Sequence, residues 1–134
     1  MFLSYLQNEN KQSFLKLCVY AALSNGVFAK EEKEMISTYC REMNIPENVP
    51  DASEPIESLL EEISKSANEA EKNIIVLEIL GLLKSDGVYD EKEKVFMEKL
   101  VQGIGVKEGI LSKINSLLDI YEVVCRELHS TIAE

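Results

Sequence analysis

Large hydrophobic residues are densest within residues 73–95, and this stretch predicts the centre of the fold. Within residues 74–83 only Glu78 and Gly81 are not large apolar residues. A helix that is apolar on nearly every side must be buried on nearly every side. We therefore predict a buried central helix. We expect Glu78 to share a narrow solvent-facing stripe with Glu71, and a partly buried acid is the alternative.

A corner and a second helix follow this central helix. Ser85-Asp86-Gly87 is predicted to end it, because glycine reaches the left-handed conformation of helix ends without a side-chain penalty. Asp90 then suits an N-cap, and Glu93 three residues later completes the spacing of a capping box. The next helix is expected to begin at Asp90 and to end at Gly103 and Gly105.

The remaining apolar positions recur at spacings of three and four, which is typical of helices, and no long run alternates as a strand would. Asn8 or Asn10 is expected to cap the first long helix, and Asn68 with Glu71 repeats the capping-box spacing before the central helix. Pro46 marks the start of a linker over residues 46–53. We expect an all-α chain of about seven helices, counting a short first one, at residues 2–6, 8–24, 30–43, 56–66, 68–83, 90–105 and 107–132.

The last of these segments carries two apolar stripes side by side. One comprises Ile110, Ile114, Leu117, Tyr121, Val124 and Leu128, and the other comprises Leu111, Leu118, Cys125 and Ile132. The segment is either one long helix or two short ones broken near Asp119. A face this wide is expected to pack on its own domain, and the alternative is a homodimer formed through part of it.

Composition restricts the classes of partner. A formal net charge of −10 repels phosphate backbones and anionic lipid, so we expect neither nucleic acid nor a bare membrane as partner. Cations or basic protein segments fit such a surface better. The chain shows no pattern of a signal peptide or of a membrane span, and Cys18, Cys40 and Cys125 suit reduced core positions. These features favour a cytoplasmic protein.

The chain contains an internal repeat. Residues 14–45 correspond to residues 75–106, so that Ser24-Asn25-Gly26-Val27-Phe28 aligns with Ser85-Asp86-Gly87-Val88-Tyr89. Each copy is predicted to form an αα-hairpin with the same corner. One hairpin cannot bury its apolar face alone, so we expect two hairpins to pack on each other within a single domain of residues 1–134.

The two corners resemble the TerB family, the tellurite-resistance domain that also occurs at the N-terminus of some DnaJ-type co-chaperones. The second copy matches the motif through Asp86, Gly87, Tyr89, Asp90 and Glu93, and the first through Gly26, Phe28 and Glu32, with Asn25 and Ala29 in place of the aspartate and the cap. The resemblance implies a cytoplasmic, non-enzymatic, all-α domain of two repeats. It also implies acidic clusters that bind metal ions.

If the two corners approach each other, their oxygen-bearing side chains could form a metal site. The candidate ligands are Asp86, Asp90, Glu93, Glu32, Glu31 and Asn25, and such hard oxygen ligands suit calcium or magnesium. The alternative is structural, with Asp90 and Glu93 serving only as caps. An EF-hand is excluded because Leu82 and Lys84 would fall at its first two ligand positions.

No catalytic constellation is evident. The single histidine, His129, lies near the end of the chain, and no glycine-rich phosphate loop occurs. We therefore predict a non-enzymatic TerB-like protein-interaction module that needs no cofactor, in a cytoplasmic stress-related or envelope-associated complex. The alternative is a divalent-cation-binding protein that uses the acidic corners.

Overall fold

The computed structural model describes residues 1–25, 30–85 and 87–133, with the side chains of Asn25 and Glu31 outside the description. These residues form helices and no strand, which confirms the predicted all-α class. The elements are η1 (Leu3–Tyr5), α1 (Asn8–Ala22), η2 (Leu23–Asn25), α2 (Lys30–Glu42), α3 (Ile56–Ser66), α4 (Glu69–Leu83), α5 (Glu91–Ile104) and α6 (Ile110–Ala133), where η denotes a 3-10 helix. Six α-helices and the short first turn correspond to the expected seven.

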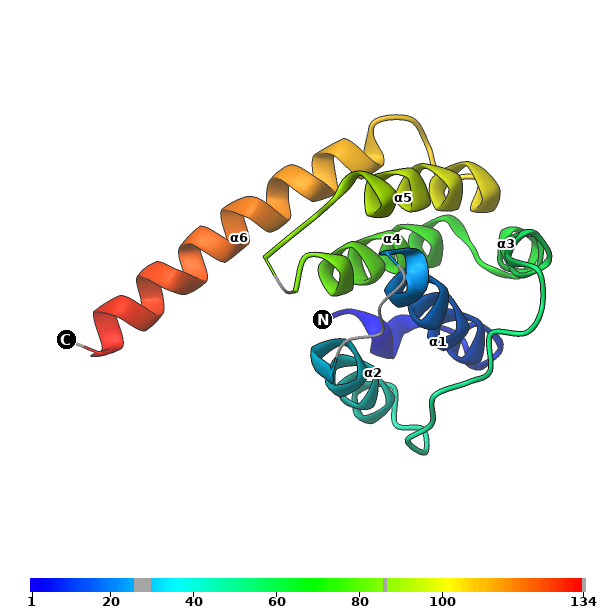
Figure 1. Ribbon diagram of the computed structural model, residues 1–134, viewed down its shortest axis with the longest axis horizontal. Helices are drawn as coiled ribbons and strands as arrows, with labels where there is room; N and C mark the ends of the chain where they lie inside the picture. The colour runs from blue at the N-terminus through cyan, green and yellow to red at the C-terminus, as the bar shows by residue number, and fades with distance from the viewer. Residues whose placement is uncertain (26–29, 86, 134) are drawn as a thin grey trace.

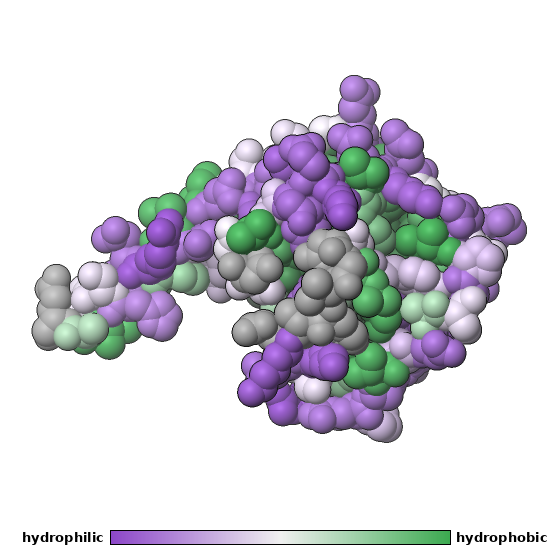
Figure 2. All heavy atoms as spheres, in the orientation of Figure 1, coloured by the Kyte–Doolittle hydropathy of each residue, from purple (hydrophilic) through white to green (hydrophobic). Residues whose placement is uncertain are grey.

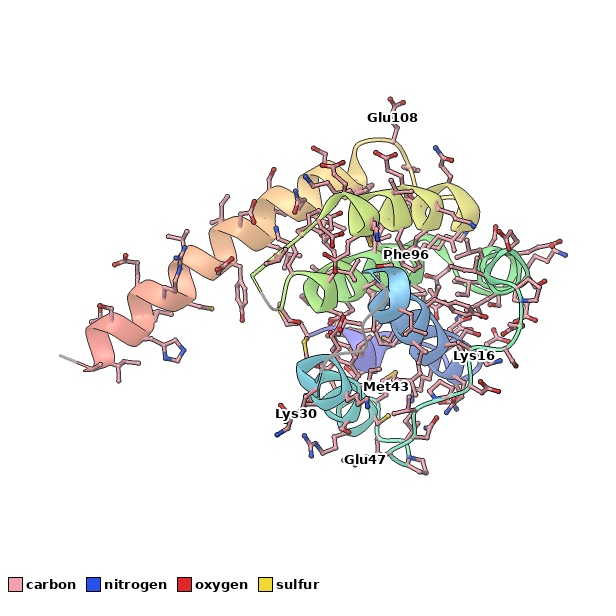
Figure 3. The ribbon with its side chains drawn as sticks, viewed as in Figure 1. Lys16, Lys30, Met43, Glu47, Phe96 and Glu108 are labelled. Atoms are coloured by element: carbon pink, nitrogen blue, oxygen red, sulfur yellow. The ribbon has the colours of Figure 1, made fainter. Side chains whose placement is uncertain are left out.

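Helix α4 is central, as its apolar sequence predicts. It packs against α1, α5 and the start of α6, while α3 lies against α1 and α5 (Figure 1). Phe96 of α5 contributes to the same core and points inward from that helix (Figure 3). The first helices of the two hairpins, α1 and α4, thus meet in the core of the molecule.

Both predicted capping boxes are present. The Asn68 side chain accepts a hydrogen bond from the Glu71 N–H, the Asp90 side chain accepts one from the Glu93 N–H, and each glutamate returns a bond to the backbone of its cap. The left-handed Gly105 ends α5. Gly87 at the corner also has a positive φ of 83°, as its expected role requires. A cap residue and a glutamate three positions later therefore fix where α4 and α5 each begin.

The expected cap of α1 is wrong. Gln7 is the N-cap residue, and its side chain makes no capping bond. Asn10 instead lies fully buried inside the helix, where its amide donates to Glu71 Oε2 at 2.8 Å. The Asn10 amide binds Glu71 instead of capping α1, because α4 places the Glu71 carboxylate beside the start of α1.

Glu71 also departs from its expected position, since it is only 2% exposed and faces no solvent stripe. One carboxylate oxygen accepts from the Gln7 N–H at 2.9 Å and from Asn10, while the other accepts from the Asn68 N–H at 3.1 Å. Burial alone would raise the pKa of Glu71, but these three donors outweigh it and lower that pKa. The carboxylate joins the N-terminal ends of α1 and α4.

Gly103 was expected to help end α5, but it lies within that helix. A Cβ at this position would lie 2.6 Å from Leu60 Cδ1 of α3. The missing side chain lets α3 and α5 approach closely. Residues 46–53, the predicted linker, have no regular secondary structure.

Helix α6 is a single helix with no break at Asp119 and no fully buried residue. Its first half lies beside α4, and its second half projects away from the body (Figure 1). The expectation that its apolar face packs on its own domain is therefore wrong for the second half. The five-residue connection from α5 is followed at once by a straight helix, which carries the chain beyond the edge of α4.

Candidate functional site

A cleft of about 710 Å³ opens between α2, α4 and α6, next to the N-terminus. Helix α2 supplies Met35, Thr38, Tyr39 and Glu42, α4 supplies Leu77, Glu78 and Gly81, and α6 supplies Leu118, Tyr121, Glu122 and Cys125. The wall is mixed, with apolar side chains between carboxylates. Its size falls within the range of pockets that hold small ligands or short segments of a partner protein.

Glu78 lines this cleft and is 6% exposed, so the expected solvent-facing stripe on α4 is wrong. Its Oε1 accepts from the amino group of Met1 at 2.7 Å and from the Phe2 N–H at 2.9 Å. A buried carboxylate is costly unless it is paired and hydrogen-bonded. The N-terminal residues meet that requirement here.

Glu42 is the second carboxylate at this point. Its Oε1 lies 2.9 Å from the Met1 amino group, and its Oε2 accepts from the Leu3 N–H at 3.1 Å. Burial lowers the pKa of the amino group, but the bonds to Glu78 and Glu42 outweigh it, so that this pKa is raised. The amino group stays charged and holds α2 and α4 together.

Sequence reasoning missed Glu42 and the Met1 amino group. Glu78 carried a signal, since it is the one acid in a run of apolar residues. Glu42 carried none, because it lies at the end of a helix rich in charged residues. Only the path of the chain past the end of α2 brings the three groups together.

The corner acids form a second candidate site. The Glu93 N–H donates to Asp90 Oδ1 at 2.8 Å, and the Asp90 N–H donates to Glu93 Oε1 at 3.0 Å. Asp90 and Glu93 therefore cap α5, as the structural alternative to a metal site predicts. Burial, and then the charges of Glu93 and Glu98, raise the pKa of the neighbouring Tyr89 to about 12.

The rest of the predicted metal set is only partly described. Glu32 is buried in the first turn of α2. Asp86 and the side chains of Asn25 and Glu31 lie outside the described residues. Within the described part of the chain, no three acidic, histidine or cysteine side chains come together as metal ligands. The assembly of all six ligands stays a prediction.

The cysteines divide into two kinds. Cys18 and Cys40 are buried in the core, as expected, and burial, followed by the charge of Glu78, raises the pKa of the Cys18 thiol. Cys125 is only half-buried and lines the cleft from α6, so its expected core position is wrong. None of the three forms a disulfide.

Comparisons with known proteins bear on this fold. No family model matches the chain, and no curated protein matches it. The crystal structure of a tellurite resistance protein from Nostoc punctiforme superposes with a TM-score of 0.69 and 25% sequence identity, over 95% of this chain and 81% of that one. The TerB-like fold is confirmed. Because the superposition covers 95% of this chain, it extends into α6.

No described helix of this TerB-like chain has the length and apolar content needed to cross a bilayer.

Proposed function

We propose that this TerB-like chain is a non-catalytic binding module that contributes to tellurite or stress resistance through a protein complex in the cytoplasm or at the cell envelope. The cleft between α2, α4 and α6 supports the proposal, because it offers an apolar wall beside carboxylates in a protein of net charge −10. Such a wall suits a protein segment that combines apolar and basic side chains. The similarity to a tellurite resistance protein supports the proposed role in tellurite or stress resistance.

Gly81 allows the cleft to be blocked without disturbing the core. It lies in α4 on the wall of the cleft, and a Cβ added there would meet nothing within 4 Å. A leucine at this position would extend into the cleft, whereas an alanine would leave most of it open. Gly81→Leu is thus the test variant, and Gly81→Ala is its matched control.

The experiment compares both variants in cells that lack the native gene. We expect Gly81→Leu to reduce tellurite tolerance and to lose the proteins that co-purify with the wild type, while Gly81→Ala keeps both. Circular dichroism shows whether each variant is folded. An unchanged set of bound proteins for a folded Gly81→Leu variant contradicts the role of the cleft. Turnover of a small molecule by the purified wild type contradicts the non-catalytic part.

A second candidate function is the binding of a divalent cation at the corners. It is favoured by one observation: Glu32 and Glu93 hold corresponding positions in the two repeats, and both are buried. Carboxylates held in this way suit calcium or magnesium, with Asp86, Asp90, Glu31 and Asn25 as the further candidate ligands.

Calorimetric titration with calcium, magnesium and manganese tests the cation candidate. We expect heat and a raised melting temperature for the wild type, and loss of both for Asp86→Asn. Asp51→Asn, in the linker, is the matched control and should behave as the wild type. The absence of heat and of any shift at millimolar ion leaves only the protein-binding function.

A further inference from the structure

The projecting part of α6 carries an apolar surface that its own body leaves open. Seven large apolar side chains from residue 117 onward are between 48% and 82% exposed: Leu117, Ile120, Tyr121, Val123, Val124, Leu128 and Ile132. Hydrophobic spheres accordingly appear along the projecting arm at the left of Figure 2. Single exposed apolar residues are ordinary, but a continuous series along one helix marks an interaction surface.

The apolar positions of α6 follow a heptad. Ile110, Ile114, Leu117, Tyr121, Val124 and Leu128 alternate at spacings of four and three, which is the seam pattern of paired helices. We call these six residues the α6 seam. The partly buried Leu111 and Leu118 lie beside it and pack against the core of the same chain, as does Ile114 of the seam itself. Beyond Ile114, the seam residues Leu117, Tyr121, Val124 and Leu128 are about half exposed.

The body contacts α6 on a side that leaves the seam accessible from Leu117 onward. Lys84, the C-cap residue of α4, bonds Asn115 and Asp119, and these two residues lie away from the seam on the helical wheel. Beside the inner half of the seam is a hollow of about 290 Å³, lined by Phe2, Leu77, Ile114, Leu117, Leu118 and Tyr121. The outer half of the seam has no such neighbour within the described chain.

We propose that a second copy of this chain covers the seam, with the two α6 helices antiparallel about a twofold axis. In this arrangement the outer half of each helix lies on the inner half of the other, next to the hollow. One register pairs all six seam residues: Ile110 lies against Leu128, Ile114 against Val124, and Leu117 against Tyr121 of the second copy. Each pair occurs twice, so every seam residue has an apolar neighbour.

Charge complementarity supports this register. Lys113 and Glu127 occupy equivalent flanking positions of their heptads, and both are exposed. In the antiparallel pair Lys113 of one copy faces Glu127 of the other, on both sides of the axis. In a parallel pair the heptad places Lys113 beside Leu118 instead. The sequence of α6 is therefore complementary to itself in the antiparallel direction.

Sedimentation equilibrium of the full chain tests the proposal. We expect the wild type to have the mass of a dimer, and Leu117→Glu to have the mass of a monomer with unchanged helix content. Lys113→Glu and Glu127→Lys should each weaken the dimer by about tenfold, because two attractive pairs become repulsive. The double variant should recover wild-type affinity. Arg126→Glu, on the other side of α6, is the matched control and should not change the mass.

A monomeric wild type at every concentration overturns the proposal. So does a dimer whose affinity neither charge reversal changes, or one that the double variant fails to restore. These results leave the proposed function of the cleft intact, since that function is read from tellurite tolerance and bound proteins with Gly81→Leu. A change in oligomeric state on Arg126→Glu would also contradict the antiparallel seam.

Discussion

Replacing Glu71 with alanine should destabilise the protein far more than an exposed glutamate on the same turn would. The change removes a carboxylate that accepts from the Gln7 and Asn68 N–H groups and from the Asn10 side chain. It leaves the buried Asn10 amide N–H without the acceptor that Glu71 supplies. The amide oxygen of Asn10 still accepts a bond from the Ser66 hydroxyl. The N-terminal ends of α1 and α4 lose their common acceptor.

The magnitude follows from these bonds. An unsatisfied buried donor costs about 1–3 kcal/mol, and a hydrogen bond to a charged group contributes about 1.5–3 kcal/mol. Loss of a cap adds about 1 kcal/mol. Since such contributions do not add fully, we expect a loss of about 4 kcal/mol in the free energy of unfolding.

Urea unfolding followed by circular dichroism measures this loss. The matched control is Glu69→Ala, two residues earlier, where an exposed carboxylate pairs with Lys107. An exposed pair of this kind contributes about 0–1 kcal/mol. If the two variants differ by less than about 1 kcal/mol, the buried network of Glu71 does not join the helices as argued.

The same residue gives a pH dependence. Because folding lowers the pKa of Glu71 below its ordinary value of 4.5, its stabilisation is complete above that value. The stabilisation is lost as the pH falls through the lower pKa of the folded state. Wild-type stability should therefore decrease more steeply on acidification than that of Glu71→Gln. Parallel curves for the two proteins would refute this reasoning.

Four further changes test the packing, each measured by urea unfolding. Gly103→Ala should cost about 1–2 kcal/mol through its clash with Leu60, whereas Gly81→Ala, with open space around it, should stabilise by about 0.5–1 kcal/mol; equal effects would contradict the close contact. Gly87→Val should cost about 1–3 kcal/mol because of the positive φ, and a neutral change would exclude that conformation. Truncation after Asn115 should leave a cooperatively folding chain, because α6 has no fully buried residue; loss of cooperativity would show that α6 completes the core.

The sequence alone determined the features that depend on neighbouring residues. The apolar run of residues 74–83 required a buried helix, because no side of it could face water. The capping boxes at Asn68 and Asp90 were readable because cap and glutamate lie three residues apart. The repeated corner indicated the TerB-like fold, because the residues of each corner motif also lie close together in the sequence.

The tertiary structure decided what depends on distant partners. Glu71 and Glu78 looked exposed because a charge in a helix usually faces solvent. Both are buried, since Gln7, Asn10 and the Met1 amino group supply donors from the far end of the chain. No local pattern encodes such pairs.

Helix α6 shows the same limit for hydrophobic residues. Its apolar spacing established a helix with a wide face, but spacing does not say what covers a face. The connection after α5 directs α6 past the edge of α4, so that only its first half can meet the body (Figure 1). Burial of an apolar surface depends on where the rest of the chain lies, and that is settled only when all the helices have packed.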